Sequence, residues 1–298
     1  MGDDGQGCPS AAERRKRESG PPRLEAAPRG QDATEGGRRA TRLADLSPVP
    51  DGLQLDSALQ GRADGPAPRD PKAFELLRQA YDTHLQGDRT ADFGRFDAAG
   101  RLYRAAFDLA SLKGDEQTAV EAQLGMAHEA CTFGHYEAAY ALCTQVAEVR
   151  PGLNPHEQAM FYTVLALAQA LKSRREGIWG LLTAGLFVKG SLDRALAAEP
   201  NFFLASYMMG RYYLAAPGPL GNREEAEKAF RSAIQHGGNH FIMRAWHVRS
   251  LQLLGQRAGA EQELAFYQKQ FADVPVARKY VEKLKAGQDP MLGPDSPL

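Results

Sequence analysis

From residue 71 onward, apolar residues recur every three or four positions, which is the spacing of one face of an α-helix. The segment PKAFELLRQAYDTHLQG (71–87) shows it first, with Phe74, Leu77 and Tyr81 on one face. Its leading proline suits a first helical turn, and its closing glycine suits a helix end. The same periodicity predicts helices over 118–132, 156–172, 202–215 and 240–254. The pattern therefore predicts an all-α chain from this point on.

A second pattern follows each of these helices. It consists of a glycine and then apolar or small residues at offsets of 2, 5, 9 and 12 from it. Full copies are Gly94, Phe96, Ala99, Tyr103, Ala106 and Gly134, Tyr136, Ala139, Cys143, Val146, and looser or shortened copies begin at Gly190, Gly221 and Gly255. Alanine at a crossing point lets two helices approach, and an aromatic ring fills the space to the next pair. The spacing predicts about five antiparallel helix pairs that stack on one another.

This arrangement, over roughly residues 90–286, resembles the tetratricopeptide repeat (TPR), which pairs two helices in about 34 residues. The resemblance implies a TPR-like α-solenoid, and the segment VPVARKYVEKLKAG (274–287) fits a helix that caps its end. It also implies a non-catalytic protein–protein interaction or scaffold protein, which binds a partner or peptide in a concave groove. The exposed ends of a short solenoid would also allow a homo-oligomer.

Two hairpins carry long connections, SRREGIWGLLTAGLFVKG (173–190) and APGPLGN (216–222), and long connections are often functional. The second lies in a stretch whose pattern resembles the T component of tripartite ATP-independent periplasmic (TRAP) transporters. The residues that carry this resemblance are Lys189, Gly190, Arg194, Ala195, Leu196, Pro200, Gly210, Arg211, Tyr212, Tyr213, Ala216, Pro217, Gly218, Ala226, Phe230 and Ala233. The resemblance implies an alternative function, a transport accessory that binds a small hydrophobic or carboxylate ligand.

Candidate binding residues come from the helix faces that would line the groove. Counting from Gly210, which is predicted at a helix crossing, Tyr207 and Arg211 face the groove, and Tyr212 follows. An arginine there could hold a carboxylate by two hydrogen bonds. By the repeat count His128 shares this face. Contact with a ligand or peptide, and ordinary packing or surface salt bridges, both remain open for these residues.

The apolar segment GIWGLLTAGLF (177–187) also allows two interpretations. Trp179 and Phe187 could belong to a buried helix, or they could close a hydrophobic pocket or contact a partner. The segment is too short for a transmembrane helix, which needs about 20 apolar residues.

Composition divides the chain into three segments. Residues 1–70 contain no Phe, Tyr or Trp, so they are predicted to be disordered. The helical domain is expected over 71–286, and residues 287–298 are expected to form a flexible tail. A net charge of −1 gives no argument for a nucleic-acid partner. The start shows no export signal, which favours the cytoplasm; a different true start with a signal would favour the periplasm.

The sequence shows no catalytic or cofactor signature. His128-Glu129 and His156-Glu157 lack the second histidine, four residues after the first, that a zinc protease helix needs. Cys143 occupies an apolar position of the repeat pattern, where a cysteine behaves as a small hydrophobic residue. We therefore predict neither an enzyme, nor a metal site, nor a cofactor.

Overall fold

The computed structural model describes residues 69–149, 152–175, 177–216, 218–237 and 240–291, and these ranges form eleven α-helices and one short 3-10 helix. All of them belong to one compact unit of the chain. The predicted disordered segment, 1–70, lies outside the described residues except for its last two positions. No β-strand occurs in the described ranges, so the prediction of an all-α chain is confirmed.

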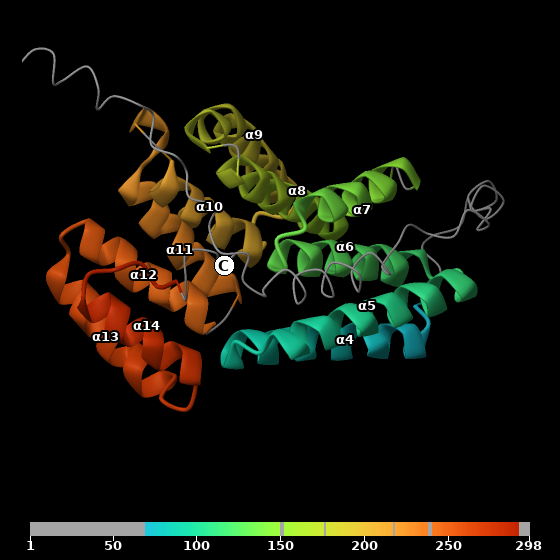
Figure 1. Ribbon diagram of the computed structural model, residues 1–298, viewed down its shortest axis with the longest axis horizontal. Helices are drawn as coiled ribbons and strands as arrows, with labels where there is room; N and C mark the ends of the chain where they lie inside the picture. The colour runs from blue at the N-terminus through green and yellow to red at the C-terminus, as the bar shows by residue number, and fades with distance from the viewer. Residues whose placement is uncertain (1–68, 150–151, 176, 217, 238–239, 292–298) are drawn as a thin grey trace, which may run out of the picture. The chain divides into compact units, whose positions relative to one another are not determined.

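The helices form five consecutive antiparallel pairs followed by a single helix (Figure 1). The pairs are α4 (Pro71–Thr90) with α5 (Phe93–Lys113), α6 (Glu116–Thr132) with α7 (Tyr136–Val149), α8 (Pro155–Arg175) with α9 (Gly177–Ala198), α10 (Phe203–Ala215) with α11 (Arg223–Gly237), and α12 (Phe241–Leu253) with α13 (Arg257–Gln270). The last helix is α14 (Pro275–Lys285), which contacts both α12 and α13. The predicted number of pairs and the capping helix are therefore both confirmed.

Several helices begin where a side chain can satisfy their first backbone N–H groups. Asp70 accepts hydrogen bonds from the N–H groups of Lys72 and Ala73, and Asp115 accepts one from Thr118 N–H. Such a cap replaces the intrahelical acceptors that the first turn lacks. Gly114 ends α5 in the left-handed conformation, which glycine adopts without strain. These local signals fix the short loops that return each chain segment antiparallel to the last.

The glycine-started repeat pattern provides the buried face of the second helices. Its members Ala99, Tyr103 and Ala106 in α5 and Ala139, Cys143 and Val146 in α7 are all buried, and so are Ala226, Phe230 and Ala233 in α11. Small residues at these positions let neighbouring helices pack closely, and the rings fill the space between pairs. The core therefore runs through consecutive pairs, as expected for a repeat fold.

The predicted insertion over 173–190 is instead almost wholly helical, which corrects the expectation of a long connection there. α9 starts at Gly177 and continues without a break to Ala198, packing against α8. Its length arises because apolar residues and alanine outweigh the cost of four glycines, each about 1 kcal/mol relative to alanine. The pair α8–α9 is therefore longer than its neighbours because its helices are longer.

The second connection is a compact turn. α10 ends at Ala215, a 3-10 helix follows over Gly218–Leu220, and the backbone N–H of Asn222 donates to the carbonyl of Tyr213 over 3.1 Å. At Gly221 a Cβ atom would lie 2.4 Å from the carbonyl oxygen of Ala216, so a side chain does not fit. The Asn222 side chain then caps α11 by accepting from the next backbone N–H groups. The turn closes the α10–α11 pair tightly.

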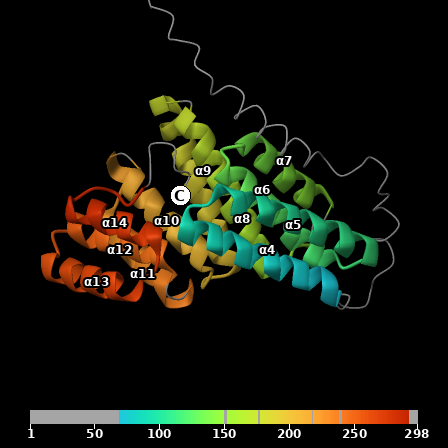
Figure 2. The same cartoon turned by 60° about the horizontal axis from the view of Figure 1, so that its bottom comes forward.

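The first and last helices meet. Both views show α14 near one end of α4 (Figures 1 and 2), and these two helices are in contact. Arg89, in the last turn of α4, pairs with Asp273, just before α14, at 3.3 Å. Residues far apart in the chain are therefore brought around a common interior. Within the described part of the chain, none of the helices has the length and apolar character needed to cross a membrane.

Candidate functional site

A cavity of about 360 Å³ lies among the first helices of the five pairs. Of its lining residues, all but Tyr103 lie on, or cap the start of, α4, α6, α8, α10 or α12. They are Phe74, Leu77, Arg78, Tyr81, His84, Leu85, Asp88, Tyr103, Glu121, Leu124, Gly125, His128, His156, Met160, Val164, Phe202, Phe203, Leu204, Tyr207, His240, Ile242 and Met243. Its volume falls within the range of small-molecule pockets, about 300–1,000 Å³. The repeat fold thus places one helix from every pair around a single site.

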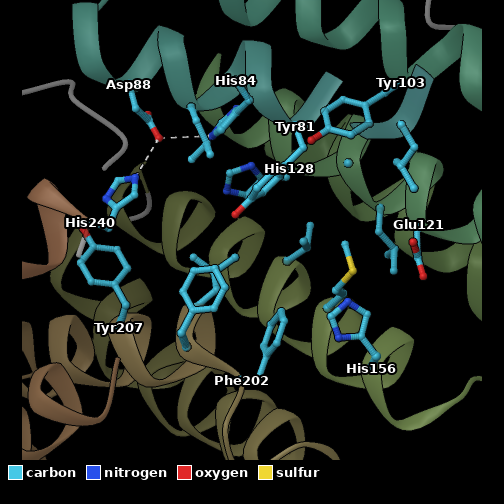
Figure 3. A pocket seen from close by; sticks show the side chains of 18 of the residues that line it. Tyr81, His84, Asp88, Tyr103, Glu121, His128, His156, Phe202, Tyr207 and His240 are labelled. Atoms are coloured by element: carbon cyan, nitrogen blue, oxygen red, sulfur yellow. Dashed lines mark ion pairs between the residues drawn. The ribbon is translucent and has the colours of Figure 1, made fainter. Parts of the chain in front are cut away.

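One end of the cavity is polar. Asp88 lies between two histidines, with its Oδ2 atom 3.5 Å from His84 Nε2 and 3.9 Å from His240 Nε2 (Figure 3). His240 Nδ1 accepts a hydrogen bond from Ile242 N–H as the cap of α12, so Nε2 carries the proton and faces Asp88. The His128 ring lies 4.9 Å from that of His84. His84 on α4 and His240 at the start of α12 therefore converge on Asp88.

Behind Asp88 lies a fully buried carboxyl group. Glu129 is 0% exposed, and its Oε1 atom lies 2.6 Å from His84 Nδ1. Its other oxygen, Oε2, has no hydrogen-bond partner among the described protein atoms. Buried charges are costly unless they are paired, so the ionisation of this carboxyl group depends on its hydrogen bond with His84. Whichever of the two holds the shared proton, the His84–Glu129 pair carries no net charge.

The surroundings shift the pKa values of this cluster strongly. Burial raises the pKa of Asp88 to about 6, although the charge of His84 opposes the shift. Burial and the charge of His84 lower the pKa of His240 to about 4 and that of His128 to about 3. Burial lowers the pKa of His84, but the hydrogen bond and charge of Glu129 outweigh it, and the net shift is upward. Near neutral pH, Asp88 therefore gives the cluster a negative charge.

The basic side chains at the cavity have carboxylates of their own. Arg69, next to the lining residue Phe74, pairs with Glu121 at 2.6 Å, and Arg78 pairs with Glu75 at 2.8 Å and Asp82 at 2.9 Å. Each of these pairs neutralises its cation locally. Asp88 differs from these carboxylates, because its ion-pair partners within the described residues are histidines.

Two of the predicted site residues line the cavity. Tyr207 is 3% exposed, and its hydroxyl accepts a hydrogen bond from Arg211 Nη1 at 3.3 Å. His128 lines the cavity from α6, with its ring next to that of His84. The repeat count predicted their helix face from sequence, because both lie on first helices of pairs.

Three other predicted residues, Arg211, Tyr212 and Phe187, are not among the residues that line the cavity. Arg211 stacks on Trp246, with its guanidinium carbon 4.5 Å from the ring centroid. Tyr212 is 9% exposed and packs against Tyr213. Phe187 is 54% exposed on α9 and is outside the lining of this cavity. Trp179 belongs to α9, but its side chain lies outside the described residues.

Sequence reasoning missed the polar end of the cavity. His84 and Asp88 are four residues apart on α4, so they share a helix face. That spacing was the available signal, but His84 meets Glu129, 45 residues away, only through the fold. Among the described residues, no group of three or more His, Cys, Asp or Glu side chains is arranged to hold a metal ion.

The buried charge of Asp88 has a measurable cost. Its pKa in the folded protein, about 6, lies above the ordinary value of 3.8. The stability that its protonated form contributes is present below pH 3.8 and is lost as the pH rises through about 6. We expect Asp88→Asn to have a larger free energy of unfolding than the wild type at about pH 7.5. The gain over the wild type should be larger at that pH than at about pH 5, by on the order of 1 kcal/mol.

Urea unfolding of both proteins at the two pH values measures this difference. Asp82→Asn is the matched control, because Asp82 lies on the same helix and is half exposed. An Asp88 variant that is less stable than the wild type at both pH values would contradict the expectation.

These features define a class of protein: a helix-pair repeat protein with a cavity among its first helices. No protein-family model and no curated protein matches the chain. Among solved structures, it is similar to TTC0263, a thermophilic TPR protein of Thermus thermophilus, with a TM-score of 0.53 and 20% identity. The match covers 72% of this chain and 99% of that one. At this identity the likeness concerns the fold, which is TPR-like.

Proposed function

We propose that this protein is a non-catalytic TPR-type interaction protein that binds a segment of a protein partner at the cavity formed by its first helices. The fold supports this function in general terms, because TPR-like repeats commonly present such a surface to other proteins. The arrangement of the cavity carries the proposal for this chain. Every helix pair contributes lining residues, so a partner segment could contact the whole repeat domain.

Two of the aromatic side chains that line the cavity are partly exposed, so a partner could contact them. Phe74 is 42% exposed and Tyr81 is 46% exposed, and both line the cavity from α4. Large aromatic side chains that are partly exposed beside a pocket are typical of interface residues.

Site-specific photocrosslinking in cells of the source organism tests the proposal. A photoreactive phenylalanine analogue would replace Phe74, Tyr81 or, as control, Leu112. Leu112 is 79% exposed on α5 and is outside the cavity lining. We expect the same partner at Phe74 and Tyr81 and none at Leu112, although Leu112 is the most accessible of the three. Equal capture at Leu112, or none at the two cavity positions, would contradict the proposal.

A second candidate is a ligand-binding accessory of the kind that the TRAP-like segment implies. The observation in its favour is the largely apolar lining of the cavity. The predicted ligand is small and either hydrophobic or a carboxylate. Native mass spectrometry of the full chain distinguishes the two, since a co-purified small molecule supports the accessory.

Location and assembly follow as further parts of the proposal. Cys131 and Cys143 are both free and buried, which supports a reducing compartment such as the cytoplasm. The exposed side chains of Leu186 and Phe187 on α9 support self-association through this helix. Analytical ultracentrifugation of the wild type and a Phe187→Ser variant would measure that association.

A further inference from the structure

We propose that the cavity binds a small amphipathic ammonium compound, whose cationic group lies against Asp88 and whose apolar part lies among Tyr81, Phe202 and Tyr207. This inference goes beyond the proposed function, because it requires no protein partner. It also names a different ligand class from the carboxylate that the TRAP-like segment implies.

The position of Asp88 carries the first part of the argument. Its side chain is 8% exposed and lines the cavity, and no lysine or arginine of the described chain forms an ion pair with it. Arg89 is its neighbour in sequence but pairs with Asp273 instead. A carboxylate that is nearly buried normally has a cationic partner, because desolvation is costly. His84 is already paired with Glu129, so a ligand ammonium group would supply the cation that balances Asp88.

The helix that holds Asp88 gives a second, independent observation. Asp88 lies in the last turn of α4, which ends at Thr90. The C-terminal end of a helix carries partial negative charge, so it disfavours a carboxylate and favours a cation. An ionised, buried aspartate at this position is therefore disfavoured both by its loss of hydration and by the helix dipole. A cation bound beside it would offset both costs.

The groups that face Asp88 from the surrounding helices leave its charge uncompensated. The pair of His84 on α4 and Glu129 on α6 is neutral overall, and burial keeps His128 and His240 uncharged by lowering their pKa values. The remaining titratable groups are phenols: Tyr81, Tyr103, Tyr207 and Tyr280, whose pKa values are raised by burial. The polar end of the cavity is therefore net negative near neutral pH, which disfavours a carboxylate ligand.

The walls of the cavity suit the rest of such a ligand. Tyr81, Phe202 and Tyr207 surround the space beside the Asp88 cluster in the close view (Figure 3). Aromatic faces attract cations as well as apolar groups, and the attraction increases when the cation is desolvated. A volume of about 360 Å³ is large enough for a short alkyl or aryl amine and too small for a bulky lipid.

Titration of the full chain with three six-carbon probes tests this inference by ligand-observed NMR. The probes are hexylammonium, 1-hexanol and hexanoate, which share the same apolar chain and differ in charge. We expect hexylammonium to bind at least tenfold more tightly than hexanol, and hexanoate more weakly than either. The affinity for hexylammonium should fall as the pH is lowered through about 6, because Asp88 becomes protonated.

Three variants assign the effect to the cavity. Asp88→Asn should weaken hexylammonium binding at least tenfold and leave hexanol binding unchanged, whereas the control Asp82→Asn should change neither. Tyr81→Leu, at a partly exposed position, should weaken hexylammonium more than hexanol and provides a second test if Asp88→Asn misfolds. Saturable binding that Asp88→Asn does not weaken, tighter binding of hexanoate, or no hexylammonium binding would overturn the inference. None of these results depends on the crosslinking of a protein partner.

Discussion

Alanine in place of Gly210 is expected to destabilise the protein by about 1–3 kcal/mol, the range for overpacking a close-packed core. A Cβ atom at this position would lie 2.7 Å from Cε1 of Phe230, whose ring is 0% exposed. The ring cannot move freely, because it also stacks on Trp246 at a centroid distance of 6.3 Å. The helices α10 and α11 would therefore have to separate at their crossing.

A second glycine-to-alanine substitution, at a helix position with free space, serves as the control and should have the opposite effect on stability. Gly190 lies inside α9, and a Cβ atom there would meet no atom within 4 Å. Gly190→Ala should stabilise the protein by about 0.5–1 kcal/mol, since alanine is the better helix former. Urea unfolding followed by circular dichroism measures the stability of both variants. The double variant Gly210→Ala with Phe230→Leu should recover part of the stability that Gly210→Ala loses. Stabilisation by Gly210→Ala would show that α10 and α11 do not approach this closely.

The repeat architecture could be predicted from the sequence because its determinants are local and periodic. Ala99, Ala139 and Ala226 occur at one offset from the glycine that starts each repeat, and all three are fully buried. Small residues at fixed spacing specify where helices cross without any knowledge of the partner helix. The long connection expected over 173–190 was wrong, because glycine weakens a helix by an amount that packing against α8 can outweigh.

The candidate site could be predicted only in part. Tyr207 and His128 were predicted on one helix face by the repeat count, and both line the cavity. The contacts of Asp88 could not be predicted in this way, because they join α4 to His240 at the start of α12. Such contacts depend on how successive pairs rotate relative to one another, and that rotation is set by packing across the whole domain. Arg211 was also assigned to the groove, but it stacks on Trp246 within the fold.

The largest effect is expected for His84→Ala, which should cost about 3 kcal/mol near pH 7. The substitution removes the hydrogen-bond partner of Glu129 Oε1, and Glu129 Oε2 already has none among the described protein atoms. An unpaired carboxylate would then remain in the core, which is more costly than the loss of the hydrogen bond itself. Thermal and urea unfolding measure the loss, and His236→Ala, at an exposed position of α11, is the control.

The pH dependence shows which physical effect dominates in this variant. Burial raises the pKa of Glu129 and His84 opposes that shift, so removing His84 raises it further. A carboxyl group whose pKa is raised in the folded protein contributes its full stabilisation below its ordinary pKa of 4.5. That stabilisation is lost as the pH rises through the pKa of the folded protein. The cost of His84→Ala should therefore be smaller near pH 5 than near pH 7. The double variant His84→Ala with Glu129→Leu should be more stable than the single one at pH 7, because it removes the buried charge. Equal costs at both pH values, with no recovery in the double variant, would show that cavity formation dominates instead.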